Sequence, residues 1–293
     1  MHVVITGASG LIGGALVGQL RQRGVSVTAV SRDPRAHTAL AGVNWTNWDG
    51  LTDAVSGAAG VVHLAGEGIV DQRWSKARKE ALRNSRIDTT RRVVTAIQES
   101  GEKPGVLISA SAIGYYGNRV ERESTESAPA GDDFLAQLCV DWEAEAQGAE
   151  VRTVNARLGI VMSTEGGALP QLLFPFKLGL GGPIGLGRAW WSWIHIEDAV
   201  GTILHALENS HVEGAINLTA PNPVRNREFS SALGRALGRP ALMPVPPLAL
   251  KLMLGEGAGV LLASQRILPT RTLDLGYRFK FTEIDAALQD LVA

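Results

Sequence analysis

Gly7, Gly10 and Gly13 stand at three-residue spacing directly after an apolar stretch at the N-terminus. This spacing suits the binding of a dinucleotide pyrophosphate. The first glycine allows a tight turn, the second lets the backbone approach the ligand, and the third lets the next helix pack on the sheet. A helix expected over residues 11–23 points its N-terminal amides and positive dipole end at the phosphates. The residues between the glycines complete the predicted loop: Ala8, Ser9, Leu11 and Ile12.

The residues after a second expected strand, at 25–30, indicate which dinucleotide is bound. A site for NAD usually places an acid about twenty residues past the glycines, whereas this chain has Ser31 and Arg32 there. A hydroxyl beside a guanidinium suits the 2′-phosphate of NADP, which needs donors and positive charge. We therefore predict NADP(H) in preference to NAD. Two alternatives to this prediction stay open. In one, Asp33 reaches a ribose of the dinucleotide. In the other, Arg32 is an ordinary solvated arginine at a strand end.

Composition narrows the classes of partner. The 293 residues carry a formal net charge of −1, which argues against nucleic acid or an anionic membrane as the main partner. The single Cys139 excludes an internal disulfide and a thiolate metal site, and no other spacing predicts a metal. No stretch is long and apolar enough to span a bilayer, and the N-terminus lacks the charged region of a signal peptide. We expect a cytoplasmic protein with a small-molecule substrate, and its oligomeric state stays open.

Strand and helix patterns alternate along the first half of the chain, which predicts a parallel sheet covered by helices on both faces. The strand expected at 61–64 ends at Leu64 and is followed by Ala65 and Gly66, where small residues let a cofactor lie against the backbone. After the glycine loop, the expected elements are strands at 61–64, 105–110 and 151–156 and helices at 74–99 and 132–147.

The predicted fold class is α/β, a Rossmann-type doubly wound parallel sheet with a smaller C-terminal substrate lobe. Residues 1–160 are expected to form the NADP-binding domain, with its core completed by about 189–218. Residues 161–293 are expected to form the substrate lobe and a separate C-terminal module.

Several motifs together resemble the extended short-chain dehydrogenase/reductase superfamily, over nearly the whole chain. They are the nucleotide loop at 6–13, the strand end at 63–66, the serine segment at 109–117 and the strand-to-helix junction at 193–198. More narrowly, the chain is similar to the atypical subgroup called epimerase family proteins. The stretches that carry this likeness are 64–67, 73–74, 85–86, 142–143, 176–185 and 217–223.

This resemblance implies roles for particular residues. Ser111 matches the catalytic serine, and Ser109 in the same segment is expected on the cofactor side. The matching helix segment implies that Arg86 and Glu80 face the dinucleotide, with Arg86 replacing charge that a missing lysine would supply. The alternative for Arg86 is an exposed position among the neighbouring arginines of that helix.

The superfamily's usual proton relay has no counterpart at its usual place. It consists of Tyr-x-x-x-Lys on the helix after the serine, where the lysine lowers the pKa of the tyrosine and the tyrosine exchanges a proton with the substrate. Residues 134–143 contain neither a tyrosine nor a lysine.

Two kinds of function therefore stay open. One is an NADP(H)-dependent oxidoreductase or epimerase/dehydratase-like enzyme, acting on an unidentified small molecule with relocated acid/base groups. The candidates for these groups are Ser111, Tyr115, Tyr116 and Glu67, although the tyrosines also suit packing and Glu67 also suits a solvent-facing loop. The other is a catalytically weak regulatory module that binds NADP(H) and responds to its redox state.

Overall fold

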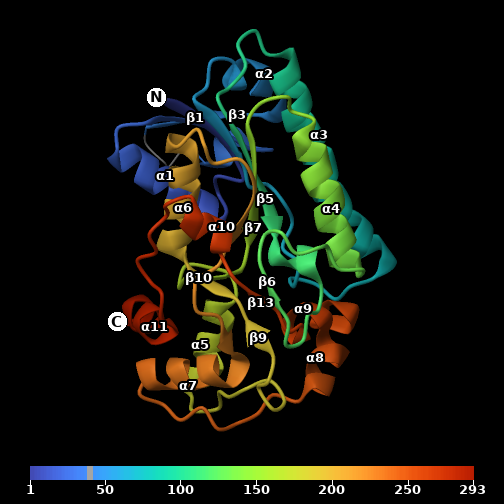
Figure 1. The fold of residues 1–293 in the computed structure, drawn as a ribbon, viewed down its shortest axis with the longest axis vertical. Helices are drawn as coiled ribbons and strands as arrows, with labels where there is room; N and C mark the ends of the chain where they lie inside the picture. The colour runs from blue at the N-terminus through green and yellow to red at the C-terminus, as the bar shows by residue number, and fades with distance from the viewer. Residues whose placement is uncertain (38–41) are drawn as a thin grey trace.

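A computed structural model describes residues 1–37 and 42–293 and is built around a parallel sheet of seven strands (Figure 1). The strand order is β11-β7-β5-β4-β1-β2-β3, so the chain starts inside the sheet and extends it in both directions. The strands are β1 (His2–Thr6), β2 (Ser26–Val30), β3 (Val43–Thr46), β4 (Gly60–His63), β5 (Leu107–Ala112), β7 (Thr153–Leu158) and β11 (Gly214–Leu218). The predicted α/β class with a doubly wound sheet is confirmed.

Helices cover both faces of the sheet because its strands bury both rows of side chains. In β1, Val3 and Ile5 belong to one core and Val4 to the other. The first core is covered by α1 (Leu11–Gln22) and α6 (Ile196–Glu208), and the second by α2 (Leu51–Val55), α3 (Lys76–Glu99) and α4 (Phe134–Gln147) (Figure 1).

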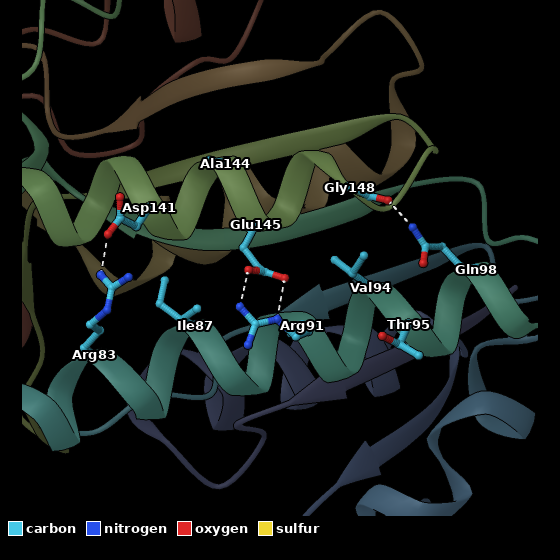
Figure 2. Close-up of a pocket in the computed structure, with 10 residues that line it drawn as sticks. All are labelled: Arg83, Ile87, Arg91, Val94, Thr95, Gln98, Asp141, Ala144, Glu145 and Gly148. Atoms are coloured by element: carbon cyan, nitrogen blue, oxygen red, sulfur yellow. Dashed lines mark hydrogen bonds and ion pairs between the residues drawn. The ribbon is translucent and has the colours of Figure 1, made fainter.

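Polar pairs join α3 and α4 along their outer surface, where they line a groove of about 550 Å³ (Figure 2). Arg91 binds both carboxylate oxygens of Glu145, at 3.1 and 2.9 Å, and Gln98 donates to the Gly148 carbonyl at 2.6 Å. Exposed pairs of this kind add little stability each, so they mainly set how the two helices lie against each other. The groove runs toward the C-terminal end of α3, away from the carboxyl ends of the strands.

Several predicted boundaries differ from the structure by one or two residues, among them those of β4, β7 and α4, and two of these differences bear on the site. Helix α3 begins at Lys76 and not at 74, because Ser75 caps it by accepting a hydrogen bond from the Arg78 amide at 3.1 Å. Strand β5 extends to Ala112 and begins at Leu107, which brings Ser111 inside the strand.

Most of the remaining elements form the smaller lobe below the sheet in Figure 1, whereas α10 (Thr270–Asp274) packs against β11 of the sheet itself. Its core surrounds Trp193 and Phe229 and contains residues of α5, α7 and α11. Three short strand pairs, β8 with β10, β9 with β12 and β6 with β13, connect the lobe internally and to the loop after β5. The strands are β6 (Glu123–Ser124), β8 (Ile160–Met162), β9 (Trp190–Trp191), β10 (Trp193–His195), β12 (Val224–Arg225) and β13 (Arg266–Ile267). The helices are α5 (Leu169–Lys177), α7 (Asn226–Ala236), α8 (Pro247–Leu254), α9 (Ala258–Leu262), α10 (Thr270–Asp274) and α11 (Ile284–Val292).

Gly13→Ala is expected to destabilise the protein by about 1–3 kcal/mol, because the new Cβ would lie 2.2 Å from the Gly7 carbonyl oxygen. Urea unfolding measures the difference. Gly18→Ala in the same helix is the control, since its Cβ would meet no atom within 4 Å and alanine favours a helix. Equal stability of the two variants would contradict the close packing described.

Candidate cofactor and catalytic site

The turn after β1 lies directly against the end of β4. Gly7 has a φ of +74°, and a Cβ there would lie 2.7 Å from the carbonyl carbon of Leu64 and 2.8 Å from the Ala65 amide nitrogen. Gly13 is equally close to the turn from the other side, with the Gly7 carbonyl where its Cβ would be. Two of the three glycines are therefore required by backbone contacts.

The N-terminus of α1 follows this turn without a capping side chain. Gly10 is the N-cap, and its amide donates to the Gly7 carbonyl at 3.0 Å. Ser9 and Gly10 are exposed, Leu11 and Ile12 are half-buried, and Ala8 is buried in the core. The first amides of a helix have no partner within it, so this end is open to an anionic group.

The end of β2 presents an arginine to solvent. Arg32 is exposed, and within residues 1–37 and 42–293 its side chain has no hydrogen-bond or ion-pair partner. Ser31 and Asp33 instead form a local turn, in which the Ser31 hydroxyl accepts from the Asp33 amide at 3.2 Å and the Asp33 carboxylate from the Arg35 amide at 3.1 Å. Asp33 is thus used by the backbone, whereas the Arg32 guanidinium is available.

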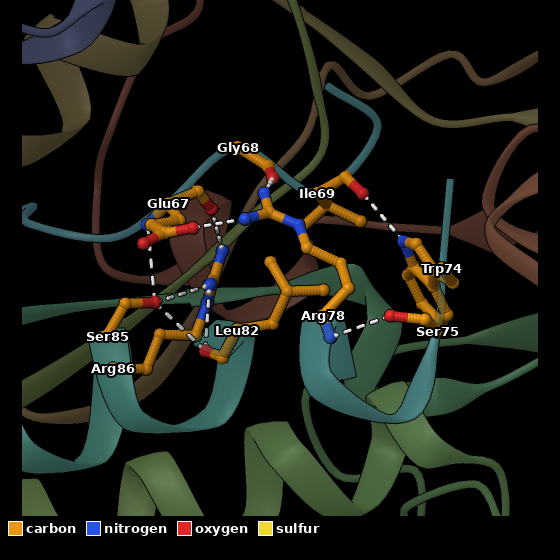
Figure 3. Close-up of polar contacts among 9 residues, drawn as sticks. All are labelled: Glu67, Gly68, Ile69, Trp74, Ser75, Arg78, Leu82, Ser85 and Arg86. Atoms are coloured by element: carbon orange, nitrogen blue, oxygen red, sulfur yellow. Dashed lines mark hydrogen bonds and ion pairs between the residues drawn. The ribbon is translucent and has the colours of Figure 1, made fainter. Parts of the chain in front are cut away.

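Two arginines of α3 hold the loop that follows β4 (Figure 3). Arg86 donates to the Glu67 carbonyl at 2.9 Å, and Arg78 donates to the Gly68 carbonyl at 2.6 Å. Arg78 also forms an ion pair with the Glu67 carboxylate, which is half-exposed. The loop backbone and the Glu67 side chain are therefore fixed to the helix.

Arg86 is only 7% exposed, so the alternative of an exposed helix residue is wrong. Its guanidinium lies 5.2 Å from the ring centroid of Trp142 and 3.6 Å from where a Cβ on Gly66 would be. Burial lowers the pKa of Arg86. Arg86 supports the loop from beneath, and direct contact with a dinucleotide stays a prediction. Glu80 is exposed on the same helix.

A buried histidine links this loop to the turn after β1. The His63 ring lies 2.6 Å from the Thr6 hydroxyl and 3.0 Å from the Thr90 hydroxyl. Thr90 donates its own proton to the Arg86 carbonyl at 2.7 Å, so it accepts from Nε2–H of His63. The other ring nitrogen, Nδ1, then accepts from Thr6, whose oxygen is free to accept from the Ala65 amide at 3.4 Å. Sequence reasoning named His63 only as part of a motif.

Ser111 belongs to a buried charged network at the end of β5. Its hydroxyl donates to Glu143 Oε1 at 2.6 Å. Arg157, its neighbour on β7, binds both oxygens of Glu143, each at 2.8 Å. Because Glu143 is ionised against Arg157 and only accepts, the single Ser111 proton points to Glu143, and Ser111 offers lone pairs alone to any other group.

Glu143 and Arg157 were missed as functional residues. The signal was present in the sequence: Glu143 lies one turn after Cys139 on the apolar stripe of its helix, and Arg157 lies in a strand whose other residues are all uncharged. An unpaired buried charge is costly, so two such residues predict each other as partners.

The two adjacent tyrosines have different environments. Tyr116 is fully buried, and its hydroxyl donates to Asn217 at 2.7 Å and accepts from Arg157 at 2.9 Å. Burial raises the pKa of Tyr116 to about 12. Tyr115 is half-buried, with its ring centroid 3.4 Å from the guanidinium carbon of Arg157, and its hydroxyl makes no hydrogen bond within the described ranges. Ser109 is buried, beside His63 in the sheet.

Residues 254–265, near the C-terminal end of the chain, contact the loops after both β4 and β5. Trp74 donates from its backbone to the Leu254 carbonyl at 3.2 Å, and Lys79 forms an ion pair with Glu256. Gln265 donates to the carbonyls of Ile113 and Gly117, each at 2.9 Å. The last part of the chain therefore helps to position both loops.

Membrane-spanning helices and metal sites are both absent from the described residues, 1–37 and 42–293. No helix among them has the length and apolar character needed to cross a membrane. No group of three or more histidine, cysteine, aspartate or glutamate side chains among them is arranged to hold a metal ion.

Stability is expected to rise with pH between about 4 and 6.5. Burial lowers the pKa of His63 from 6.5 to about 4, so over this window the unfolded chain binds a proton that the folded protein excludes. The stabilisation, on the order of 3 kcal/mol, is complete above pH 6.5 and is lost as the pH falls toward 4. Unfolding free energies against pH should show this slope reduced in His63→Gln. The exposed His211→Gln is the control, and an unchanged slope in His63→Gln would rule out the buried neutral ring.

Comparison with known proteins places the chain in a family. Residues 3–218 match the model of the NAD dependent epimerase/dehydratase family, and residues 245–291 match a domain of unknown function, DUF1731. The chain is 39% identical over 300 residues to human epimerase family protein SDR39U1, with all of both chains covered. It is 39% identical to epimerase family protein YfhF of Bacillus subtilis, over all of this chain and 98% of the relative.

Solved structures agree. The crystal structure of human epimerase family protein SDR39U1 (isoform 2) with NADPH superposes with a TM-score of 0.93 at 38% identity, covering 100% of this chain and 99% of the other. A Thermus thermophilus UDP-glucose 4-epimerase in complex with NAD has the same fold, with a TM-score of 0.79 at 20% identity, over 100% of this chain and 98% of the other. The chain therefore belongs to the NAD-dependent epimerase/dehydratase family and is a homologue of the epimerase family proteins SDR39U1.

Proposed function

We propose that this protein binds NADP(H) and uses it to reduce a small molecule, as an oxidoreductase or epimerase of the extended short-chain dehydrogenase class. The observation that carries the proposal is the backbone cradle at Gly7 and Gly13, where a Cβ would collide with the main chain. A cradle without side chains beside the open N-terminus of α1 fits a pyrophosphate. The NADPH in the crystal structure of the human relative supports the same choice.

Each end of the cofactor has residues suited to hold it. Arg32 provides a guanidinium that has no partner among the described residues and suits the 2′-phosphate, with Ser31 beside it. The backbone at Leu64, Ala65 and Gly66 offers a narrow surface against which the nicotinamide half can lie. Arg86 and Arg78 act on the cofactor through the loop that they hold.

When bound, NADPH would supply the hydride for the reduction of a substrate carbonyl. Among the candidate groups, Tyr115 is best suited to give the proton to the carbonyl oxygen, since its hydroxyl makes no hydrogen bond to the described residues and the Arg157 guanidinium lies over its ring. Ser111 accepts a hydrogen bond from the hydroxyl that forms, because its own proton is directed at Glu143. Tyr116 holds Arg157 and Asn217 in place, and Glu67 holds Arg78.

The second candidate function is a catalytically weak module that binds NADP(H) and responds to its redox state. One feature favours it: α4 begins with Phe134, packed between Trp74 and Lys79, near the place where the superfamily carries its tyrosine. Calorimetric titration with NADPH and NADH, followed by a panel of carbonyl compounds and sugar nucleotides, separates the two. Tight NADPH binding with turnover supports the enzyme, and tight binding without turnover supports the module.

Arg32→Ala is expected to weaken NADPH binding at least about tenfold and to leave NADH binding nearly unchanged, because a charged hydrogen bond to the 2′-phosphate is lost. Calorimetry with the two cofactors measures both affinities. Arg35→Ala, an exposed arginine three residues away, should change neither. Equal losses for NADPH and NADH in Arg32→Ala would show that this guanidinium does not recognise the 2′-phosphate.

Tyr115→Phe should lower the turnover of any panel compound by about 10²–10⁴-fold without changing NADPH affinity, because a positioned proton donor is removed. Tyr116→Phe is the comparison: it removes one buried hydrogen bond from Asn217 and one from Arg157 and should cost about 1–3 kcal/mol of stability, with turnover retained. If the second variant lost turnover and the first kept it, the two roles would be reversed.

A further inference from the structure

Large apolar side chains gather on the surface of the C-terminal lobe. Within residues 1–37 and 42–293, twelve such side chains are exposed; Met1, Val120 and Leu273 lie elsewhere, and the other nine lie in segments 174–186 and 242–253. We call these nine the apolar face: Phe174, Leu178, Leu180, Leu186, Leu242, Met243, Leu248, Leu252 and Met253. Their exposed fractions range from 54% to 80%, so the face is open in this chain.

The two segments lie side by side where residues 181–185 meet residues 243–245. The Met243 amide donates to the Gly181 carbonyl at 3.1 Å, and the Val245 amide donates to the Pro183 carbonyl at 2.8 Å. The Gly185 amide donates back to the Val245 carbonyl at 2.9 Å. Helix α8 follows immediately and buries none of its eight residues. In Figure 1, α8 and the loop that leads to it from α7 lie at the lower end of the molecule, opposite α2.

The charged side chains of the two segments have one sign. Residues 166–196 and 229–255 contain no aspartate or glutamate. They contribute four exposed basic side chains without an ion-pair partner among the described residues: Lys177, Arg188, Arg239 and Lys251. A fifth, Arg235, is paired with Asp285.

The acids that flank these segments are largely engaged elsewhere. Glu197 is paired with Lys280 and Glu256 with Lys79. Glu228 accepts a hydrogen bond from the Arg225 amide at 2.7 Å. The net charge of −1 for the whole chain therefore conceals a local surface that is both apolar and positive.

We propose that the apolar face binds the surface of a bilayer containing anionic lipids. Exposed leucines, methionines and a phenylalanine enter the boundary between headgroups and acyl chains, while lysines and arginines attract anionic headgroups. Helix α8 is about 12 Å long, far shorter than the roughly 30 Å hydrocarbon core, so contact is limited to the membrane surface. This inference concerns where the protein acts and is independent of its proposed reaction.

Charge also argues against a second copy as the occupant. A two-fold contact places the same patch of both subunits together, so the four lysines and arginines of one face would meet those of the other. Like charges brought together in an interface are unfavourable. An anionic surface instead meets all four bases with opposite charge.

The test is flotation of the purified full-length protein with two kinds of vesicle. One is phosphatidylcholine alone, and the other is an equimolar mixture of phosphatidylcholine and phosphatidylglycerol. The wild type is expected to float with the anionic vesicles, less so as salt is raised, and to stay largely unbound with the neutral ones. Leu252→Glu should abolish binding, and Lys251→Gln should weaken it about fivefold.

Leu273→Glu, an exposed leucine outside the apolar face, is the matched control and should bind like the wild type. Circular dichroism and NADPH titration establish that each variant is folded. Three results would overturn the proposal: no binding of the wild type to anionic vesicles, equal binding of Leu252→Glu and Leu273→Glu, or a wild-type dimer in sedimentation that Leu252→Glu converts to monomer without any vesicle binding.

Discussion

The structure depends on the contact between the turn after β1 and the end of β4. Two stretches of main chain approach so closely at Gly7 and Leu64 that no side chain fits between them. Gly13 brings α1 equally close to the same turn. Strand β4, the turn and the helix are thereby fixed as one unit, and the hydrogen bonds from Thr6 through His63 to Thr90 extend that unit to α3. The shape of the predicted cofactor cradle is thus a property of backbone packing more than of particular side chains.

A second constraint is the buried pair of Glu143 and Arg157. Removing two charges from water costs several kcal/mol per ion, and this cost is repaid only where geometry and additional hydrogen bonds are good. Here both carboxylate oxygens are used, and the guanidinium also donates to Tyr116. The same pair directs the Ser111 proton inward and lies against the ring of Tyr115. One ion pair therefore determines the direction of the Ser111 hydrogen bond and contacts the ring of Tyr115.

Much of the fold could be predicted from the sequence, because it follows from patterns among residues that are close together in the chain. The glycine spacing, the apolar strands and the alternation of strand and helix predicted the parallel sheet, with boundaries wrong by about two residues where Ser75 caps α3. The site was harder to predict, since its contacts join distant residues. Nothing in the local sequence shows that Tyr116 is buried against Asn217 while the hydroxyl of its neighbour Tyr115 makes no hydrogen bond within residues 1–37 and 42–293. Both tyrosines belong to one short 3₁₀ turn, in which their rings lie at 79° to each other.

The order of the strands along the chain has a consequence for biosynthesis. Strand β7 ends at Leu158, yet its outer neighbour β11 begins only at Gly214, so a growing chain presents an unpaired strand edge until more than fifty further residues are made. Strand β6 stays unpaired for longer still during synthesis, because its partner β13 begins only at Arg266. Open edges and distant pairings slow folding and invite association with other chains. Protection by a chaperone during synthesis matters most in the interval between these strands.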